Sequence, residues 1–135
     1  MADLHEICKE LIRTVDGALG AAVVDLDSGL LLGVAHSVPY FTQSYLDAVA
    51  AAAVDLFRGE TVCTVEEILA NTRGVEVKHM VREIQMTTDE TLHFMSVIAN
   101  KPNALVVMIT NKKTNLGMGW TAVRKAVATA APLCP

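Results

Sequence analysis

Apolar residues recur three or four positions apart through the first fifteen residues, which is the period of an amphipathic helix. The positions that share one side of such a helix are Leu4, Ile7, Cys8, Leu11, Ile12 and Val15. Asp3 and Glu6 have the spacing of a capping box, in which the first acid accepts from a first-turn amide and the second reaches back. The pattern predicts a helix that begins near Leu4.

Two apolar segments follow, residues 18–25 and 30–35, and Asp27, Ser28 and Gly29 between them are typical turn residues. The sequence therefore predicts a hairpin. Neither segment alternates with polar residues, so we expect both strands to be covered on both faces and to lie near the middle of a sheet.

Residues 42–58 form a second predicted helix whose polar residues occupy one narrow stripe. The rest of its circumference is apolar and rich in alanine, more than one face of a sheet can cover. A helix packed inside a larger core is the alternative, but 135 residues offer no third layer. We therefore expect a second subunit to cover the outer side, through Tyr45, Ala48, Val49, Ala52, Asp55 and Leu56.

Residues 59–78 are less regular, and we interpret them as a variable connection. Thr64 and Glu67 have capping spacing, which predicts one or two helical turns over residues 64–70, ended by residues 71–74.

Three strands are predicted next, at residues 81–87, 91–99 and 104–110, joined by turns short enough to make neighbours antiparallel. The first mixes charged and apolar residues, as an edge strand does, and the last is apolar throughout, as a central strand is.

A final helix is predicted from Asn115, with a buried side made of Leu116, Trp120, Val123, Val127 and Ala130. Gly117 and Gly119 in its first turns each cost about 1 kcal/mol relative to alanine. We expect the sheet to approach the helix backbone there.

The predicted order is α-β-β-α-β-β-β-α. With this order, residues 4–15, the hairpin of residues 17–33 and residues 114–117 resemble the Roadblock/dynein light chain family, whose bacterial branch includes the partner of the gliding-motility GTPase. The resemblance implies an α+β fold: a five-stranded antiparallel sheet with the first and last helices on one face and the middle helix on the other. A long connection at residues 59–78 and a tryptophan at position 120 depart from the family pattern.

The resemblance also implies a homodimer, in which the helix of residues 42–58 and the edge strand of residues 81–87 meet their own copies. Arg82, Ile84 and Met86 then join the expected interface. The implied role is to bind and regulate a small Ras-like GTPase, or to scaffold a polarity or motility assembly. The implied protein is not an enzyme and needs no arginine finger of its own.

Composition limits the function classes. The chain has 11 basic and 15 acidic residues, a formal charge of −4, and 52% hydrophobic residues, which indicates one folded domain over residues 1–135 and disfavours nucleic acid as a partner. No apolar run approaches the roughly 18 residues of a membrane span. Three cysteines without a CxxC pair, and no signal peptide, predict a cytoplasmic location.

Candidate chemistry is sparse. The four histidines have no metal-ligand spacing, and Gly117 and Gly119 lack the third glycine of a dinucleotide motif, so we expect no metal, no cofactor and no catalytic residue. His93 is expected to be a half-buried, hydrogen-bonded strand residue. The alternative function is a small-molecule sensor, with a ligand held between sheet and helices by Met95, Met118 and Trp120.

Overall fold

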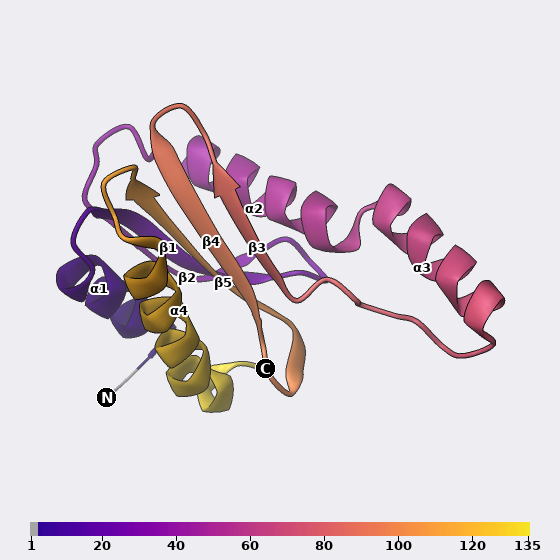
Figure 1. The fold of residues 1–135 in the computed structure, drawn as a ribbon. Coiled ribbons are helices and arrows are strands. Elements are labelled where there is room, and N and C mark those ends of the chain that lie inside the picture. Colours follow the sequence, from indigo (N-terminus) through magenta and orange to yellow (C-terminus); the bar gives the residue numbers. More distant parts are fainter. Residues whose placement is uncertain (1–2) are drawn as a thin grey trace.

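The computed structural model describes residues 3–135, in which a five-stranded antiparallel sheet lies between helices on its two faces (Figure 1). The strand order is β2-β1-β5-β4-β3. In chain order the elements are α1 (Leu4–Thr14), β1 (Ala18–Asp25), β2 (Leu31–His36), α2 (Gln43–Arg58), α3 (Glu60–Arg73), β3 (Glu83–Thr87), β4 (Thr91–Ile98), β5 (Lys101–Asn111), α4 (Leu116–Ala130) and the short 3-10 helix η1 (Ala131–Leu133). The α+β prediction is confirmed, with one helix more than the sequence predicted.

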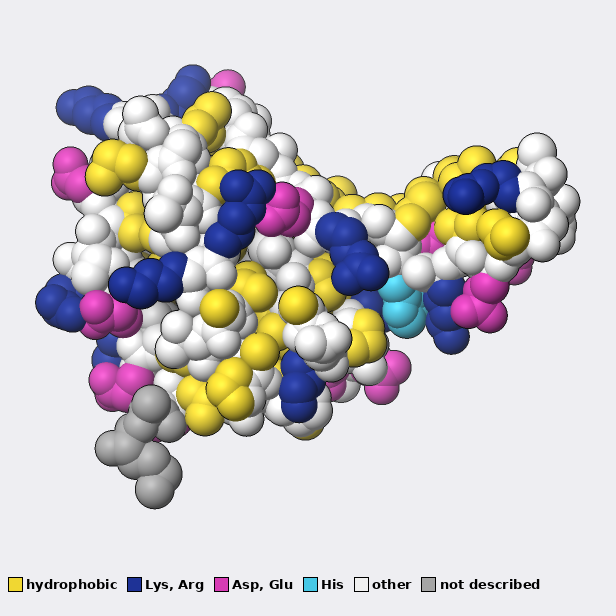
Figure 2. Space-filling view, turned by 60° about the horizontal axis from the view of Figure 1, so that its bottom comes forward, with side chains coloured by type: hydrophobic (Ala, Val, Ile, Leu, Met, Phe, Trp, Pro, Cys, Tyr) yellow, Lys and Arg dark blue, Asp and Glu magenta, His cyan; other side chains and the backbone are white. Residues whose placement is uncertain are grey.

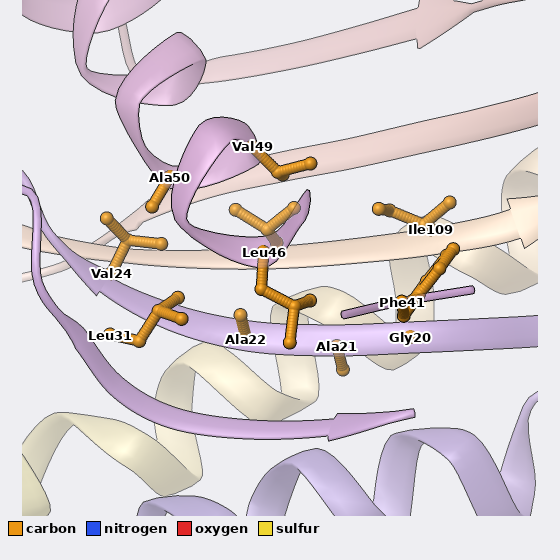
Figure 3. A pocket seen from close by; sticks show the side chains of 11 residues that line it. Gly20, Ala21, Ala22, Val24, Leu31, Phe41, Leu46, Val49, Ala50 and Ile109 are labelled. Atoms are coloured by element: carbon orange, nitrogen blue, oxygen red, sulfur yellow. The ribbon is translucent and has the colours of Figure 1, made fainter. Parts of the chain in front are cut away.

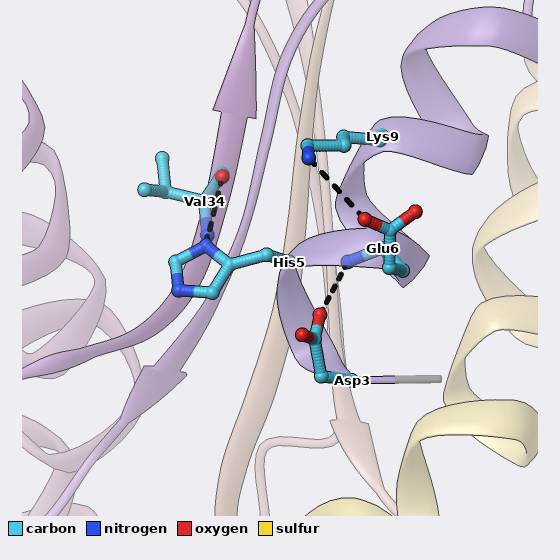
Figure 4. A network of polar contacts seen from close by, with 5 residues as sticks. All are labelled: Asp3, His5, Glu6, Lys9 and Val34. Atoms are coloured by element: carbon cyan, nitrogen blue, oxygen red, sulfur yellow. Dashed lines mark hydrogen bonds and ion pairs between the residues drawn. The ribbon is translucent and has the colours of Figure 1, made fainter. Parts of the chain in front are cut away.

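Helix α1 begins at the predicted residue. The Glu6 backbone N–H donates to Asp3 Oδ1 at 2.8 Å, which satisfies one of the unpaired amides of the first turn. The Glu6 carboxylate forms an ion pair with Lys9 Nζ at 3.2 Å (Figure 4). The carboxylate is therefore turned along the helix rather than back over its start.

The predicted hairpin is confirmed, and Gly29 takes the positive φ of 77° that its turn requires. The predicted place of its second strand is wrong, because β2 is an edge strand and only β1 lies inside the sheet. The apolar residues of β2 are covered by helices on the two faces: Leu32 and Ala35 pack with the cluster of α1 and α4, and Leu31 and Val34 with that of α2. The edge and central positions predicted for β3 and β5 are confirmed.

Two hydrophobic layers lie on opposite faces of the sheet. Successive residues of β5 alternate between them: Val106 and Met108 pack under α1 and α4, and Leu105 and Val107 under α2. The first and last helices therefore share one face and α2 covers the other, as the resemblance implied.

Helix α4 begins after Asn115, whose side chain accepts from the Met118 N–H. Val123 and Ala130 are fully buried as predicted, and Trp120 and Val127 are half-buried. The prediction that Leu116 is buried is wrong: this residue is the first of the helix, where the helix has not yet reached the sheet, and it is 48% exposed.

One of the two helix glycines is approached as expected. A Cβ added at Gly119 would lie 2.5 Å from the buried Phe94 ring of β4. At Gly117 the nearest atom is only the Asn115 side-chain oxygen, at 3.2 Å, so the prediction holds for Gly119 alone.

The connection at residues 59–78 differs most from its prediction. It holds the fourteen-residue helix α3, not one or two turns over residues 64–70. Thr64 is no cap: it lies inside the helix, and its hydroxyl donates to the Glu60 carbonyl at 3.0 Å. The predicted stop is confirmed, since Gly74 ends α3 with φ 68°. In Figure 1 α3 extends away from the sheet on the side of β3.

Candidate functional site

The outer side of α2 is a largely apolar helix surface that the rest of the described chain leaves uncovered. Leu46, Ala50, Ala53 and Phe57 face the sheet and are buried. The residues predicted from the sequence for a helix interface lie on the other side: Tyr45, Ala48, Ala52, Asp55 and Leu56 are exposed, and Val49 is half-buried. Alanines on this side allow another helix to come close, because no long side chain holds it away.

Strand β3 presents an unpaired edge beside α2. The Arg82 carbonyl, just before β3, accepts from the Val97 N–H at 2.9 Å, so the backbone groups of Arg82 point toward β4. Backbone groups alternate in direction along an antiparallel strand, so those of Glu83, Gln85 and Thr87 point away from β4. Within residues 3–135 no backbone hydrogen bond reaches these outward groups.

The other predicted residues of this strand lie on the same side as α2. Ile84 and Met86 are half-buried and pack with the cluster beneath α2, whereas Arg82 is exposed just before β3 begins. The structure therefore brings the two predicted parts of the interface, helix and strand, to one edge of the molecule.

The opposite edge of the sheet is occupied by a side chain of α1. His5 Nδ1 lies 3.2 Å from both the backbone nitrogen and the backbone oxygen of Val34 in β2 (Figure 4). Nδ1 accepts from the Val34 N–H in the tautomer that has its proton on Nε2, and it donates to the Val34 carbonyl when Nδ1 itself carries a proton. This role of His5 was not predicted from the sequence, where the only signal for it is a histidine on the polar side of α1.

An ion pair joins β3 to α4. Arg124 Nε and Nη2 donate to the two Glu83 carboxylate oxygens at 3.1 and 2.9 Å, and its guanidinium carbon lies 5.0 Å from the centre of the Trp120 ring. The hydrogen bond from Arg124 lowers the pKa of Glu83. This pair holds α4 against the face of β3 that α2 does not cover. Trp120 contributes by packing against the Arg124 guanidinium.

The histidines do not form a site together. His5 lies on α1, His36 ends β2, His79 precedes β3, and His93 lies in β4. The predicted hydrogen bond of His93 is confirmed, with Nε2 3.0 Å from Thr91 Oγ1, but the side chain is buried rather than half-buried. Burial lowers the pKa of His93. Among residues 3–135 no three histidine, cysteine or acidic side chains gather as metal ligands would.

A small apolar cavity lies between α2 and the sheet, with a volume of about 20 Å³ (Figure 3). Phe41, Leu46 and Ile109 are among its lining residues. A space of this size holds about one water molecule, and its apolar walls offer that water no partner. It has no room for a metabolite.

The lining predicted for a sensor is not assembled. Met95 packs on the α2 face, Trp120 packs on the α1 and α4 face, and Met118 is 67% exposed. The predicted set is therefore wrong, because the Met95 side chain points to the face that α2 covers, whereas Met118 and Trp120 belong to α4 on the other face.

Comparison of the sequence with known proteins finds no relative: no family model and no curated protein matches it. None of the helices over residues 3–135 combines the length and the apolar character needed to cross a membrane.

Solved structures do match. A Roadblock/LC7 domain from Streptomyces avermitilis is 20% identical, with a TM-score of 0.70 and 97% of each chain covered. Gliding protein MglB from Thermus thermophilus is 19% identical, with a TM-score of 0.71 over 96% of this chain and 86% of that one. MglB from Myxococcus xanthus is 16% identical, with a TM-score of 0.68 over 93% and 82%. The element order, the placement of the helices on the two faces and these matches together show that the chain has the Roadblock/LC7 fold.

Proposed function

We propose that this chain is a non-catalytic, homodimeric interaction module, in which α2 and β3 of one copy meet α2 and β3 of another. The observation that carries the proposal is the exposed, alanine-rich side of α2 next to an edge strand whose outward backbone groups are unpaired. A second copy satisfies both surfaces at once, because β3 pairs with β3 and extends the sheet beneath two packed helices.

The opposite edge supports this choice of surface. At β2, His5 already bonds to the outward backbone of Val34, which makes that edge a poorer template for another strand. At β3 the charged pair of Glu83 and Arg124 lies on the α4 side and leaves the strand's outer edge open.

Helix α3 supports it as well. It continues from α2 after Gly59, and it extends outward beyond β3, away from the sheet (Figure 1). Its exposed apolar residues Val65, Ile68 and Leu69 are 41%, 58% and 36% exposed and lie three or four positions apart, on one side of the helix. Contact with the second copy covers them.

We further propose that the dimer binds a small Ras-like GTPase or scaffolds a motility assembly in the cytoplasm. The support is the family resemblance of the sequence together with the fold match to gliding proteins, one of which is described as MglB with a tetrameric arrangement. Three cysteines without a disulfide suit a reducing compartment.

Sizing by light scattering tests the dimer. Two chains of 14.5 kDa give about 29 kDa, and we expect this mass for the wild type at micromolar concentration. Ala52→Arg puts a charge into a close helix contact and is expected to give a 14.5 kDa species. Ala128→Arg, at an exposed alanine of α4, is the matched control and should stay dimeric. A wild-type monomer, or a dimer unaffected by Ala52→Arg, contradicts the proposed interface.

Affinity capture tests the partner. Tagged wild type and Ala52→Arg are used to capture proteins from the native lysate, with added GDP or a non-hydrolysable GTP analogue, and mass spectrometry identifies what is retained. We expect a P-loop GTPase held by the wild type in one nucleotide state and lost with the variant. The purified GTPase then shows in a turnover assay whether hydrolysis changes. Equal capture by both variants, or no GTPase and no motility protein, contradicts this part of the proposal.

A further inference from the structure

A polar pocket of about 250 Å³ lies where the segment between α3 and β3 returns to the body of the protein. Arg58, Lys78 and Arg82 contribute its cationic groups, and Glu76 and His79 complete its polar wall. These residues come from the end of α2 and from the chain leading into β3, so α3 separates them in sequence. Figure 2 shows lysine or arginine side chains and a histidine close together where the α3 region leaves the body.

Arg58 is held in place by the start of β5. Its Nη1 donates to Asn103 Oδ1 at 3.1 Å and its Nη2 donates to the Pro102 carbonyl. Burial lowers the pKa of Arg58, although a guanidinium stays charged at any physiological pH. Its charge is therefore fixed at the back of the pocket, with neutral oxygens as hydrogen-bond partners.

The other two cations have no acidic partner. In the described part of the chain no carboxylate lies within ion-pair distance of Lys78 or Arg82. Their charges are felt inside the pocket: after burial, the positive charges of Arg58, Lys78 and Arg82 lower the pKa of His79, while Glu66 acts in the opposite direction.

A buried glutamate fixes the wall of the pocket. Glu66 of α3 is 5% exposed and accepts from the Met80 N–H at 2.8 Å, while His79 takes a positive φ of 53° that turns the chain at this point. Glu66, Glu76 and Asp27, whose charge acts on Arg58, balance the three cations, 3 − 3 = 0, in a chain whose formal charge is −4. The junction is therefore less acidic than the chain as a whole.

We propose that this pocket binds the phosphoryl group of a small molecule. Arg58 comes from the end of α2, and Lys78 and Arg82 come from the segment before β3, so cations line the pocket from two elements. Lys78 and Arg82 are still able to donate, and such a set of donors suits the oxygens of a phosphoryl group. The volume lies below the range of about 300–1,000 Å³ typical of sites for drug-sized ligands, so the ligand is smaller than a nucleotide. A bound phosphoryl group ties the segment between α3 and β3 to the end of α2. The inference concerns a single chain and does not depend on the proposed dimer.

Calorimetric titration at constant ionic strength tests it. The probes are inorganic phosphate and glycerol 3-phosphate, which separate free phosphate from a phosphomonoester, with glycerol as the uncharged comparison. We expect saturable binding of one or both phosphates and none of glycerol. Lys78→Gln and Arg82→Gln are each expected to weaken binding about tenfold, because each removes a charge-assisted hydrogen bond. Lys112→Gln, at the far end of β5, is the matched control and should bind as the wild type does.

Circular dichroism of each variant without phosphate confirms that it is folded before titration. Lys78 and Arg82 lie on the surface side of the pocket, and no side-chain hydrogen bond within residues 3–135 depends on them, so their replacement leaves the fold intact. The inference is overturned if neither phosphate binds at millimolar concentration, or if the Lys78 and Arg82 variants bind as tightly as the Lys112 variant.

Discussion

Replacing Gly119 with alanine tests how closely α4 packs on the sheet. The added Cβ lies 2.5 Å from Phe94 Cζ and 2.7 Å from its Cε2, and Phe94 is fully buried with Trp120 packed edge-on at 5.5 Å. The ring cannot swing away, so helix or strand must shift, and overpacking of this kind costs about 1–3 kcal/mol. Alanine returns about 1 kcal/mol through its higher helix propensity. We expect Gly119→Ala to lower the free energy of unfolding by up to about 2 kcal/mol, and to leave it about 1–3 kcal/mol below that of an alanine variant that gains the same propensity without the clash.

Gly117→Ala is the matched control, because its Cβ meets only the Asn115 side-chain oxygen, at 3.2 Å. We expect this variant to be as stable as the wild type or up to about 1 kcal/mol more stable. Urea unfolding followed by the fluorescence of the single tryptophan, at one fixed protein concentration, measures both. The expected midpoint for Gly119→Ala is up to roughly 1 M urea lower than that of the wild type, and lower than that of Gly117→Ala. The packing argument is refuted if Gly119→Ala is as stable as Gly117→Ala.

Two further predictions use the buried titratable groups. Burial lowers the pKa of His93 below its ordinary 6.5, so the unfolded chain binds this proton more readily than the folded chain does. The stability of the protein should therefore fall as the pH drops from 7 through 6.5 and below, and it should fall less steeply in His93→Gln. Thermal melts between pH 7.5 and pH 5 measure this. An equally steep decline in the variant contradicts this. Burial raises the pKa of Cys8 to about 12 and also raises that of Cys134, so a disulfide reagent at pH 8 should label exposed Cys63 rapidly and the other two only after unfolding. Rapid labelling of all three in the native state contradicts this.

The elements that the sequence predicted well are those whose local and tertiary signals agree. Helix α1 has a cap and a clean apolar side, and β5 is apolar because it is paired on both sides and covered on both faces. β3 alternates because Ile84 and Met86 pack on the α2 side while the residues between them are exposed. In each case burial on a known face sets the pattern.

Strand β2 was misplaced because burial pattern and sheet position are separate properties. Its residues are apolar since helices lie on both faces of the sheet, and hydrogen-bond pairing at its outer edge leaves no mark on side-chain polarity. The contact that occupies this edge joins His5 to Val34, 29 residues apart, and no short-range pattern encodes it.

Helix α3 was missed for a different reason. Its N-cap residue is Gly59, which has no side chain to cap the first turn. β-branched residues are also frequent in its first turns, and they lower helix propensity. It also has little periodic burial to detect, because the structure buries only Glu66 among its residues. The residues predicted for a ligand site failed because apolar character does not say which layer a side chain joins, and Met95 and Trp120 face opposite layers.

The exposed apolar side of α3 suggests that α3, β3 and α2 belong to one interface. A helix of fourteen residues is marginally stable in water alone, and α3 receives little packing from its own chain beyond the Glu66 contact. Such a helix needs burial elsewhere, and it extends toward the same side on which β3 has unpaired backbone and α2 has exposed alanines. If a second copy covers all three, Ile68→Glu should weaken the dimer as Ala52→Arg does, whereas Glu67→Gln, one residue away and also exposed, should not. A dimer that tolerates Ile68→Glu but not Ala52→Arg would place α3 outside the interface and require another partner for its apolar side.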